Sequence, residues 1–138
     1  MKKIFLIIAI FTVFLNAHEE QDGKAKINDL IILPGIGKAI KANEKDIAIT
    51  KEQDEQMIEK IKSVFPQKVQ EVRQKVVIIE TKVQEGILNG ATSNELEKDL
   101  EEIAKLKIEL AKIKIEALNN LKKILTKEQW NKIIQYLK

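Results

Sequence analysis

Residues 94–124 read NELEKDLEEIAKLKIELAKIKIEALNNLKKI, and this stretch decides the fold class. It contains no glycine or proline, and most of its residues favour an α-helix. Aliphatic residues recur at steps of three or four, which predicts one amphipathic helix about 45 Å long at about 1.5 Å per residue. Its apolar residues fall into two stripes. The first stripe is Leu96, Leu100, Ile103, Leu106, Leu110, Ile113, Ala117, Leu121 and Ile124, and the second is Ala104, Ile108, Ala111, Ile115 and Leu118.

A second long helix is predicted directly upstream, over residues 66–88. The run VVII at residues 76–79 would suit a strand by itself, but the helical spacing persists far beyond the roughly 10 residues that strands seldom exceed. Pro66 suits the first turn of a helix, where its missing N–H costs nothing. The predicted apolar face of this helix is Phe65, Val69, Val72, Val76, Ile79, Val83 and Ile87.

The two long helices are expected to form an antiparallel hairpin. Asn89-Gly90 has turn chemistry, and Thr92 or Ser93 caps the helix that follows. One apolar stripe of residues 94–124 is enough to pack against the upstream helix, so the second stripe needs another partner. We expect that partner to be a second copy of the chain, a client protein, or both.

The candidate client or dimer face is the second stripe with its neighbouring lysines. Lys105, Lys107, Lys112 and Lys114 lie among the stripes. They are either charges that hold an unfolded chain loosely, or ordinary solvated lysines whose stems cover the edge of the core. The residues assigned to this face are Ala104, Ile108, Ala111, Ile115, Leu118, Lys105 and Lys112.

The pentapeptide ITKEQ at residues 49–53 returns as LTKEQ at residues 125–129. Each copy has the form of a capping box, in which a threonine caps a helix and the glutamine three residues on reaches back to the threonine N–H. Replacing one such cap is expected to cost about 1 kcal/mol, and the motif residues are interpreted as structural. They are Ile49, Thr50, Gln53, Leu125, Thr126 and Gln129, with Trp130 as the partner of Leu125 in a hydrophobic staple.

The two copies of the motif predict the first and the last of four main helices. The first copy predicts a helix over residues 51–63 that buries Met57, Ile58 and Ile61. The second predicts a final helix from residue 127 onward, which buries Trp130, Ile133, Ile134 and Leu137. The sequence as a whole therefore predicts an all-α protein.

The N-terminal residues 1–17 are typical of a secretory signal peptide. Lys2 and Lys3 precede an apolar run at residues 4–15, which is shorter than the roughly 20 residues of a membrane span. We expect cleavage after Ala17, and the alternative is an uncleaved anchor. Residues 18–48 are expected to form an N-terminal arm, loose to about residue 30, with a turn at Pro34-Gly35 and room for a short helix over residues 36–42.

Composition argues against several classes of function. The formal charge is 24 − 21 = +3, and +1 without Lys2 and Lys3, so nothing points to nucleic acid as a partner. The chain has no cysteine and one histidine, which leaves no nucleophile–base pair, and we expect no enzymatic activity and no cofactor. A zinc site typically needs four ligands, and His18 alone is only a weak metal candidate.

The two T-x-x-Q motifs, at residues 49–53 and 125–129, bracket a long predicted helical hairpin in a small exported chain without cysteine. This arrangement resembles the Spy/CpxP/ZraP family, which has a pair of L-T-x-x-Q motifs. The resemblance covers residues 49–138, and it is strongest at residues 119–129. Ile49 departs from the leucine that is usual in the first motif. The resemblance implies four thin helices that form a cradle-like antiparallel homodimer in the periplasm.

The same resemblance implies an ATP-independent, holdase-type chaperone that binds unfolded or misfolded envelope proteins during stress. A regulatory partner of a membrane sensor kinase, without general client binding, is the alternative. A metal-stress-related periplasmic protein and a purely structural helical envelope protein are further alternatives.

Overall fold

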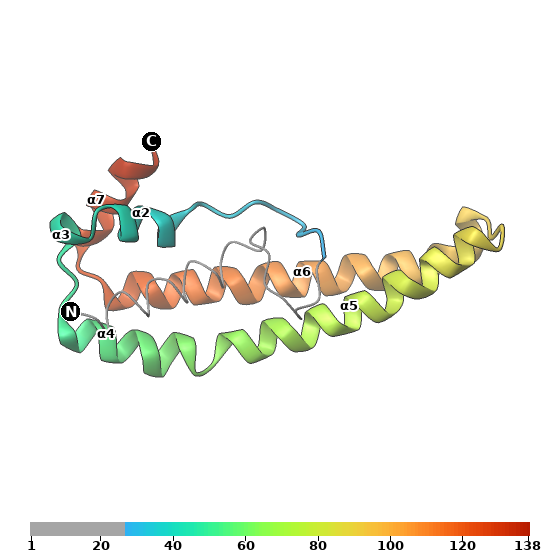
Figure 1. Cartoon of the computed structure of the whole chain (residues 1–138), viewed down its shortest axis with the longest axis horizontal. Coiled ribbons are helices and arrows are strands. Elements are labelled where there is room, and N and C mark those ends of the chain that lie inside the picture. Colours follow the sequence, from blue (N-terminus) through green and yellow to red (C-terminus); the bar gives the residue numbers. More distant parts are fainter. Residues whose placement is uncertain (1–26) are drawn as a thin grey trace.

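The computed structural model describes residues 27–138, and every regular element in this range is helical (Figure 1). The prediction of an all-α fold is confirmed. The signal peptide predicted for residues 1–17, together with His18, lies outside the described residues. The elements are α2 (Ile36–Ala42), α3 (Glu44–Ile47), α4 (Lys51–Met57), the π-helix η1 (Ile58–Lys62), α5 (Phe65–Leu88), α6 (Ser93–Ile124) and α7 (Lys127–Leu137). None of the helices described is long and apolar enough to cross a membrane.

Helices α5 and α6 lie side by side along most of their length and run in opposite directions (Figure 1). Pro66 lies in the first turn of α5, as predicted. The apolar faces of the two helices meet in a cluster of buried side chains, whose members are Val69, Val72, Val76, Leu106 and Leu110. The helical spacing of the sequence therefore identified the residues that join α5 to α6.

The predicted apolar faces are covered unevenly along the molecule. Near the turn between α5 and α6, Ile87 remains 59% exposed, and Leu100 of the first stripe is also exposed. Only these two helices are present at that end (Figure 1). Two helices bury one narrow seam, so apolar residues at its edge stay in contact with water.

The turn between the two long helices is built from local signals. Gly90 adopts a φ of 81°, a left-handed conformation that favours glycine. Thr92 then caps α6 through its side chain, which accepts a hydrogen bond from the N–H of Glu95, and Glu95 reaches back to the Thr92 N–H. The sequence allowed either Thr92 or Ser93 as the cap, and this third capping box decides for Thr92.

The helix predicted over residues 51–63 is observed as α4 continued by η1. The Ser63 N–H and hydroxyl both donate to the Ile58 carbonyl oxygen, at 3.0 and 2.9 Å, and this five-residue closure marks a π-type turn. Met57, Ile61 and Phe65 follow at four-residue steps and are all buried. A wider turn suits uninterrupted four-residue steps better than the ordinary 3.6 residues per turn.

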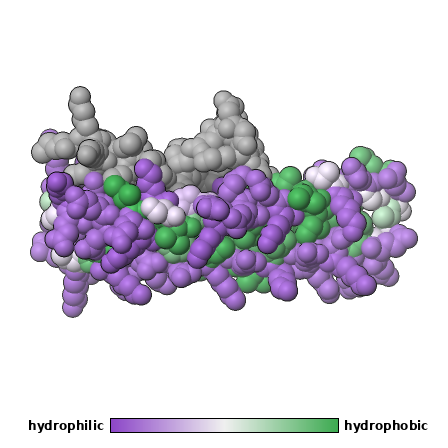
Figure 2. All heavy atoms as spheres, turned by 90° about the horizontal axis from the view of Figure 1, so that it is seen from below, coloured by the Kyte–Doolittle hydropathy of each residue, from purple (hydrophilic) through white to green (hydrophobic). Residues whose placement is uncertain are grey.

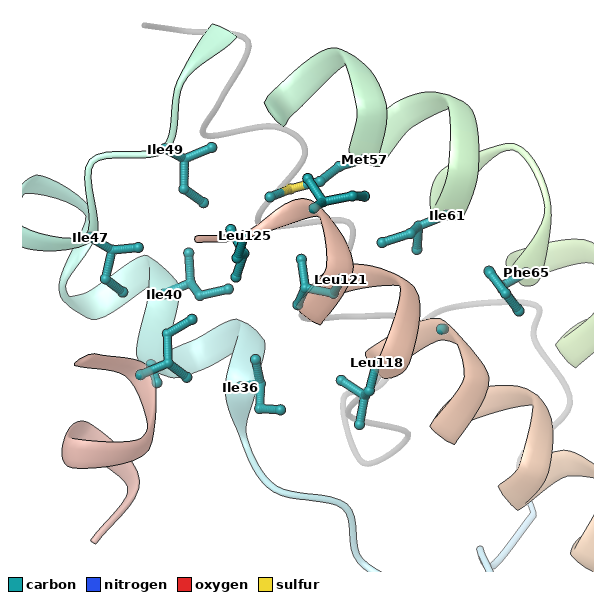
Figure 3. Close-up of a cluster of buried hydrophobic side chains, with 14 residues drawn as sticks. Ile36, Ile40, Ile47, Ile49, Met57, Ile61, Phe65, Leu118, Leu121 and Leu125 are labelled. Atoms are coloured by element: carbon teal, nitrogen blue, oxygen red, sulfur yellow. The ribbon is translucent and has the colours of Figure 1, made fainter. Parts of the chain in front are cut away.

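The N-terminal segment packs more closely than the sequence predicted. Residues 36–42 form the short helix α2, and α2 and α3 contact α7. Ile36, Ile40, Ile47 and Ile49 lie in the larger of two clusters of buried side chains, which we call the main core. Its other buried members are Ala39, Met57, Ile61, Phe65, Ala117, Leu118, Leu121, Ile124, Leu125 and Ile133. Figure 3 shows the four isoleucine side chains pointing toward Leu121 and the residues around it. The sequence allowed the short helix over residues 36–42 but did not indicate that residues 36–49 belong to the core, because helices of seven and four residues are too short to show a clear period.

Gly90→Ala should lower the free energy of unfolding by about 1 kcal/mol, because alanine is strained at a positive φ. Gly35→Ala is the control: Gly35 has a φ of −73°, and a methyl group added there would meet no other atom within 4 Å, so its change should stay within about 0.5 kcal/mol. Urea unfolding followed by circular dichroism measures both. Equal destabilisation by the two substitutions would contradict the role given to the turn.

Candidate functional site

The two copies of the repeated motif contact each other. Both predicted capping boxes are present, with Thr50 capping α4 and Thr126 capping α7. The Gln53 Nε2 donates to the Gln129 Oε1 at 2.7 Å, and the Gln129 Nε2 donates to the Gln53 Oε1 at 3.0 Å. The two amides thus form a closed, reciprocal pair between residues far apart in the sequence.

Each glutamine amide also bonds to the backbone of both motifs. The Oε1 of Gln53 accepts from the Thr50 N–H at 3.0 Å, and the Oε1 of Gln129 accepts from the Thr126 N–H at 2.9 Å. The second N–H of each amide donates across the pair, from Gln53 to the Ile124 carbonyl and from Gln129 to the carbonyls of residues 47 and 48. Both amides are buried and use their full capacity for hydrogen bonds.

The sequence did not predict this pairing, because each motif was interpreted as a local cap. The signal that would have indicated it is the identity of the two copies, because a symmetric pair needs the same residues on both sides. The third capping box has no such partner: Thr92 and Glu95 are exposed, and hydrogen bonds from Thr92 lower the pKa of Glu95. Capping alone therefore does not explain why Gln53 and Gln129 are buried.

The structure divides the candidate client or dimer face into an exposed part and a covered part. The covered residues are Leu118, which belongs to the main core, and Ala111, which lies beneath residues 29–33. Ile108 and Ile115 are 45% and 41% exposed on α6. The exposed members of the predicted face are Ala104, Lys105, Ile108, Lys112 and Ile115. We call these five residues the open row.

Apolar surface is visible along the long helices, between charged side chains (Figure 2). Within the open row, Ile108 and Ile115 are two helical turns apart, and Lys105 and Lys112 flank them. The row thus combines branched aliphatic groups with mobile ammonium groups. Such a surface can adsorb an apolar chain loosely.

Two of the lysines predicted to lie beside this face are engaged in ion pairs. Lys107 lies 2.9 Å from Glu80, and Lys114 lies 2.8 Å from Asp29 with only 3% of its side chain exposed. Burial lowers the pKa of Lys114, and the hydrogen bond from Lys114 to Asp29 opposes that shift. The interpretation of Lys114 as an ordinary solvated charge at the edge of the core is therefore wrong, because Asp29 covers it.

The last helix is fixed through its first turn and its polar edge. Trp130 packs against the main core and Lys122 lies over its ring, 5.8 Å from the centroid. Ile133 is fully buried, but Ile134 and Leu137 are exposed, contrary to prediction. Ile134 is rotated about 100° from Ile133 and faces away from the core. Leu137 lies one turn beyond Ile133 on the same face, but it is the last residue of α7 and stays exposed at the free end of the helix.

No group of three or more metal-ligating side chains occurs among the residues that the structure describes. The weak metal candidate His18 lies outside them. No protein-family model, curated protein or solved structure matches the chain. The candidate site therefore rests on its own geometry, with the glutamine pair as its support and the open row as its surface.

Gln129→Ala should lower the free energy of unfolding by about 2–3 kcal/mol, because it removes both hydrogen bonds between the two buried amides and leaves the carbonyls of residues 47 and 48 without the Gln129 donor. The matched control is Glu95→Ala, which removes the same position from the exposed capping box and should cost about 0.5–1 kcal/mol.

A double-mutant cycle separates the pair from its caps. Gln53→Ala combined with Gln129→Ala should cost less than the sum of the two single changes by about 1–2 kcal/mol, because the second change removes a group already left unpaired. Chemical denaturation of the four proteins measures this coupling. Strict additivity would show that the two amides act only as separate caps.

Proposed function

We propose that this protein is a periplasmic, ATP-independent chaperone of the holdase type, exported by residues 1–17, that binds unfolded or aggregation-prone envelope proteins. The observation that carries the proposal is the open row of α6. Ile108 and Ile115 are large aliphatic side chains that remain close to half exposed on α6, as does Leu100 nearer the turn, whereas the other large apolar residues of this helix are buried or partly buried. The resemblance of residues 49–138 to the Spy/CpxP/ZraP family supports the same function.

The physical properties of the open row suit weak and broad binding. An exposed aliphatic row removes apolar surface of an unfolded chain from water without requiring a particular sequence. Lys105 and Lys112 attract acidic segments of the client and limit self-aggregation of the chaperone. A shallow surface also releases its client readily, so no ATP is needed for release.

The proposal includes a cradle-like antiparallel homodimer in which the long helices of two copies pack together. The open row is then either the seam of the dimer or the surface that faces the client. Catalysis is not part of the proposed function, because the chain has no cysteine and a single histidine.

The purified protein, added in stoichiometric amounts to a chemically denatured client diluted into buffer without ATP, should suppress the rise in light scattering. Two unrelated clients are needed, because broad binding is the property under test. Unchanged scattering with both would contradict the chaperone proposal and favour a regulatory partner with one specific target, such as an envelope stress sensor kinase.

The double variant Ile108→Asp/Ile115→Asp should suppress aggregation poorly, so that the protein concentration required rises by about tenfold or more. The reason is that two apolar contacts with the client, of about 1 kcal/mol or more each, are removed. Ile78→Asp/Leu88→Asp is the matched control, because these residues are 69% and 87% exposed on α5, outside the open row.

Sedimentation velocity on the same proteins distinguishes the two roles of the open row. A monomeric Ile108→Asp/Ile115→Asp variant identifies the row as the dimer seam. A dimeric variant that no longer holds clients identifies it as the client surface. Wild-type behaviour in both assays would exclude both roles.

A further inference from the structure

Residues 27–35, with the sequence INDLIILPG, run along α6 as an extended segment, which we call the strap (Figure 1). The strap ends where α2 begins. Its residues and four residues of α6 line one narrow cavity, and the α6 residues are Lys107, Leu110, Ala111 and Lys114. Because Ala111 also belongs to the predicted client face, the strap lies on the surface adjoining the open row.

Side chains rather than backbone hold the strap in place. Among the described residues, no backbone–backbone hydrogen bond involves residues 28–33. Ile27 packs on the cluster between α5 and α6, Leu33 packs on the main core, and Asp29 pairs with Lys114. The nine residues of the strap are therefore attached to the helices through two aliphatic side chains and one carboxylate.

The outer side of the strap buries little apolar surface in this position. Leu30 and Ile31 are about half exposed, and Ile32 is 89% exposed. An extended segment that is held by the partly buried Ile27, Asp29 and Leu33 and leaves its other aliphatic residues in water resembles a bound segment of an unfolded chain. Its loss from α6 would uncover apolar surface next to Ile108 and Ile115.

The polar fit beneath the strap is incomplete. The Oδ1 of Asp29 and the Nε and Nη2 of Arg73 are buried without a hydrogen-bond partner in the described structure. Burial lowers the pKa of Arg73, and the nearby charge of Asp29 opposes this shift. The site thus holds two cations, Arg73 and Lys114, and the single carboxylate of Asp29 satisfies only one of them by hydrogen bonding. Unpaired buried groups of this kind weaken the bound state.

We propose that the strap is an exchangeable internal ligand, and that the site beneath it receives client segments of the same chemistry: extended, aliphatic and carrying a carboxylate. The carboxylate of the client binds Lys114 and Arg73, and its aliphatic residues take the positions of Ile27 and Leu33. The proposal rests on the proposed chaperone function and adds to it the class of segment bound. It also adds a regulation, because a closed strap reduces the apparent affinity for clients by the fraction of molecules that are open.

The first test measures binding of a fluorophore-labelled peptide with the strap sequence, residues 27–35, by fluorescence anisotropy. The full-length chain with Asp29→Lys opens its own strap by repulsion from Lys114 and Arg73, and it should bind the peptide about tenfold more tightly than the wild type. The same peptide with Asp29→Lys should not bind. Glu59→Lys, an equal charge change at an exposed site, is the control and should bind the peptide as the wild type does.

Hydrogen exchange of residues 27–33 shows whether Asp29→Lys has opened the strap. Faster exchange there without tighter peptide binding would overturn the proposal. Equal binding of the aspartate and lysine peptides would overturn the requirement for a carboxylate.

The second test locks the strap closed. The chain has no cysteine, so Ile31→Cys with Ala111→Cys provides the only two thiols, both on the wall of the same cavity. A short bis-maleimide joins them, and the same double variant capped with N-ethylmaleimide is the unlinked control. The linked protein should require several times more protein than the control to suppress aggregation of a denatured client.

The outcomes separate this inference from the chaperone function on which it rests. Suppression of aggregation that is equal in the linked and capped proteins would retain the chaperone function and overturn the exchange of the strap. Peptide binding that follows the predicted order, without suppression of aggregation by any variant, would support the site and overturn the chaperone function.

Discussion

The reciprocal hydrogen bonds between Gln53 and Gln129 hold together the two ends of the described chain. Each glutamine lies three residues into a helix, and each amide completes its own cap while bonding to the backbone that precedes the other. The start of α4 and the start of α7 are therefore fixed relative to each other by one buried polar contact. A buried amide is costly unless all of its bonds are made, so this contact tolerates few other arrangements of the two helices.

The main core assembles around that fixed point. Side chains from α2, α3, α4, η1, α6 and α7 meet there, with Ile47, Ile61, Leu121 and Ile133 almost wholly buried (Figure 3). The α5–α6 pair extends away from this core and has only its own seam. The two ends of the molecule therefore differ in character: one is closed by several layers, and the other leaves Leu88 and Ile78 in water. The open row lies between these two ends, on the middle part of α6.

The sequence predicted what depends on local spacing and failed where contacts are distant. Three- and four-residue steps located α5 and α6, and the two T-x-x-Q motifs located the starts of α4 and α7. The same motifs gave no indication that Gln53 bonds to Gln129, because a capping box is complete without a partner. Lys114 likewise resembled its neighbours Lys105 and Lys112. Only its position beneath Asp29, a residue far away in the chain, makes it a buried charge.

The buried ion pair and the buried amide pair have different consequences for the molecule. The amides satisfy each other fully, so separating them costs hydrogen bonds on both sides, and they act as a permanent joint. Lys114 and Asp29 leave Arg73 and one carboxylate oxygen unsatisfied, and water would supply the missing bonds if the segment moved away. Desolvation of charges offsets much of their attraction. The contact that holds the strap is therefore weaker than the joint between the two motifs, and it lies on the helix that carries the open row.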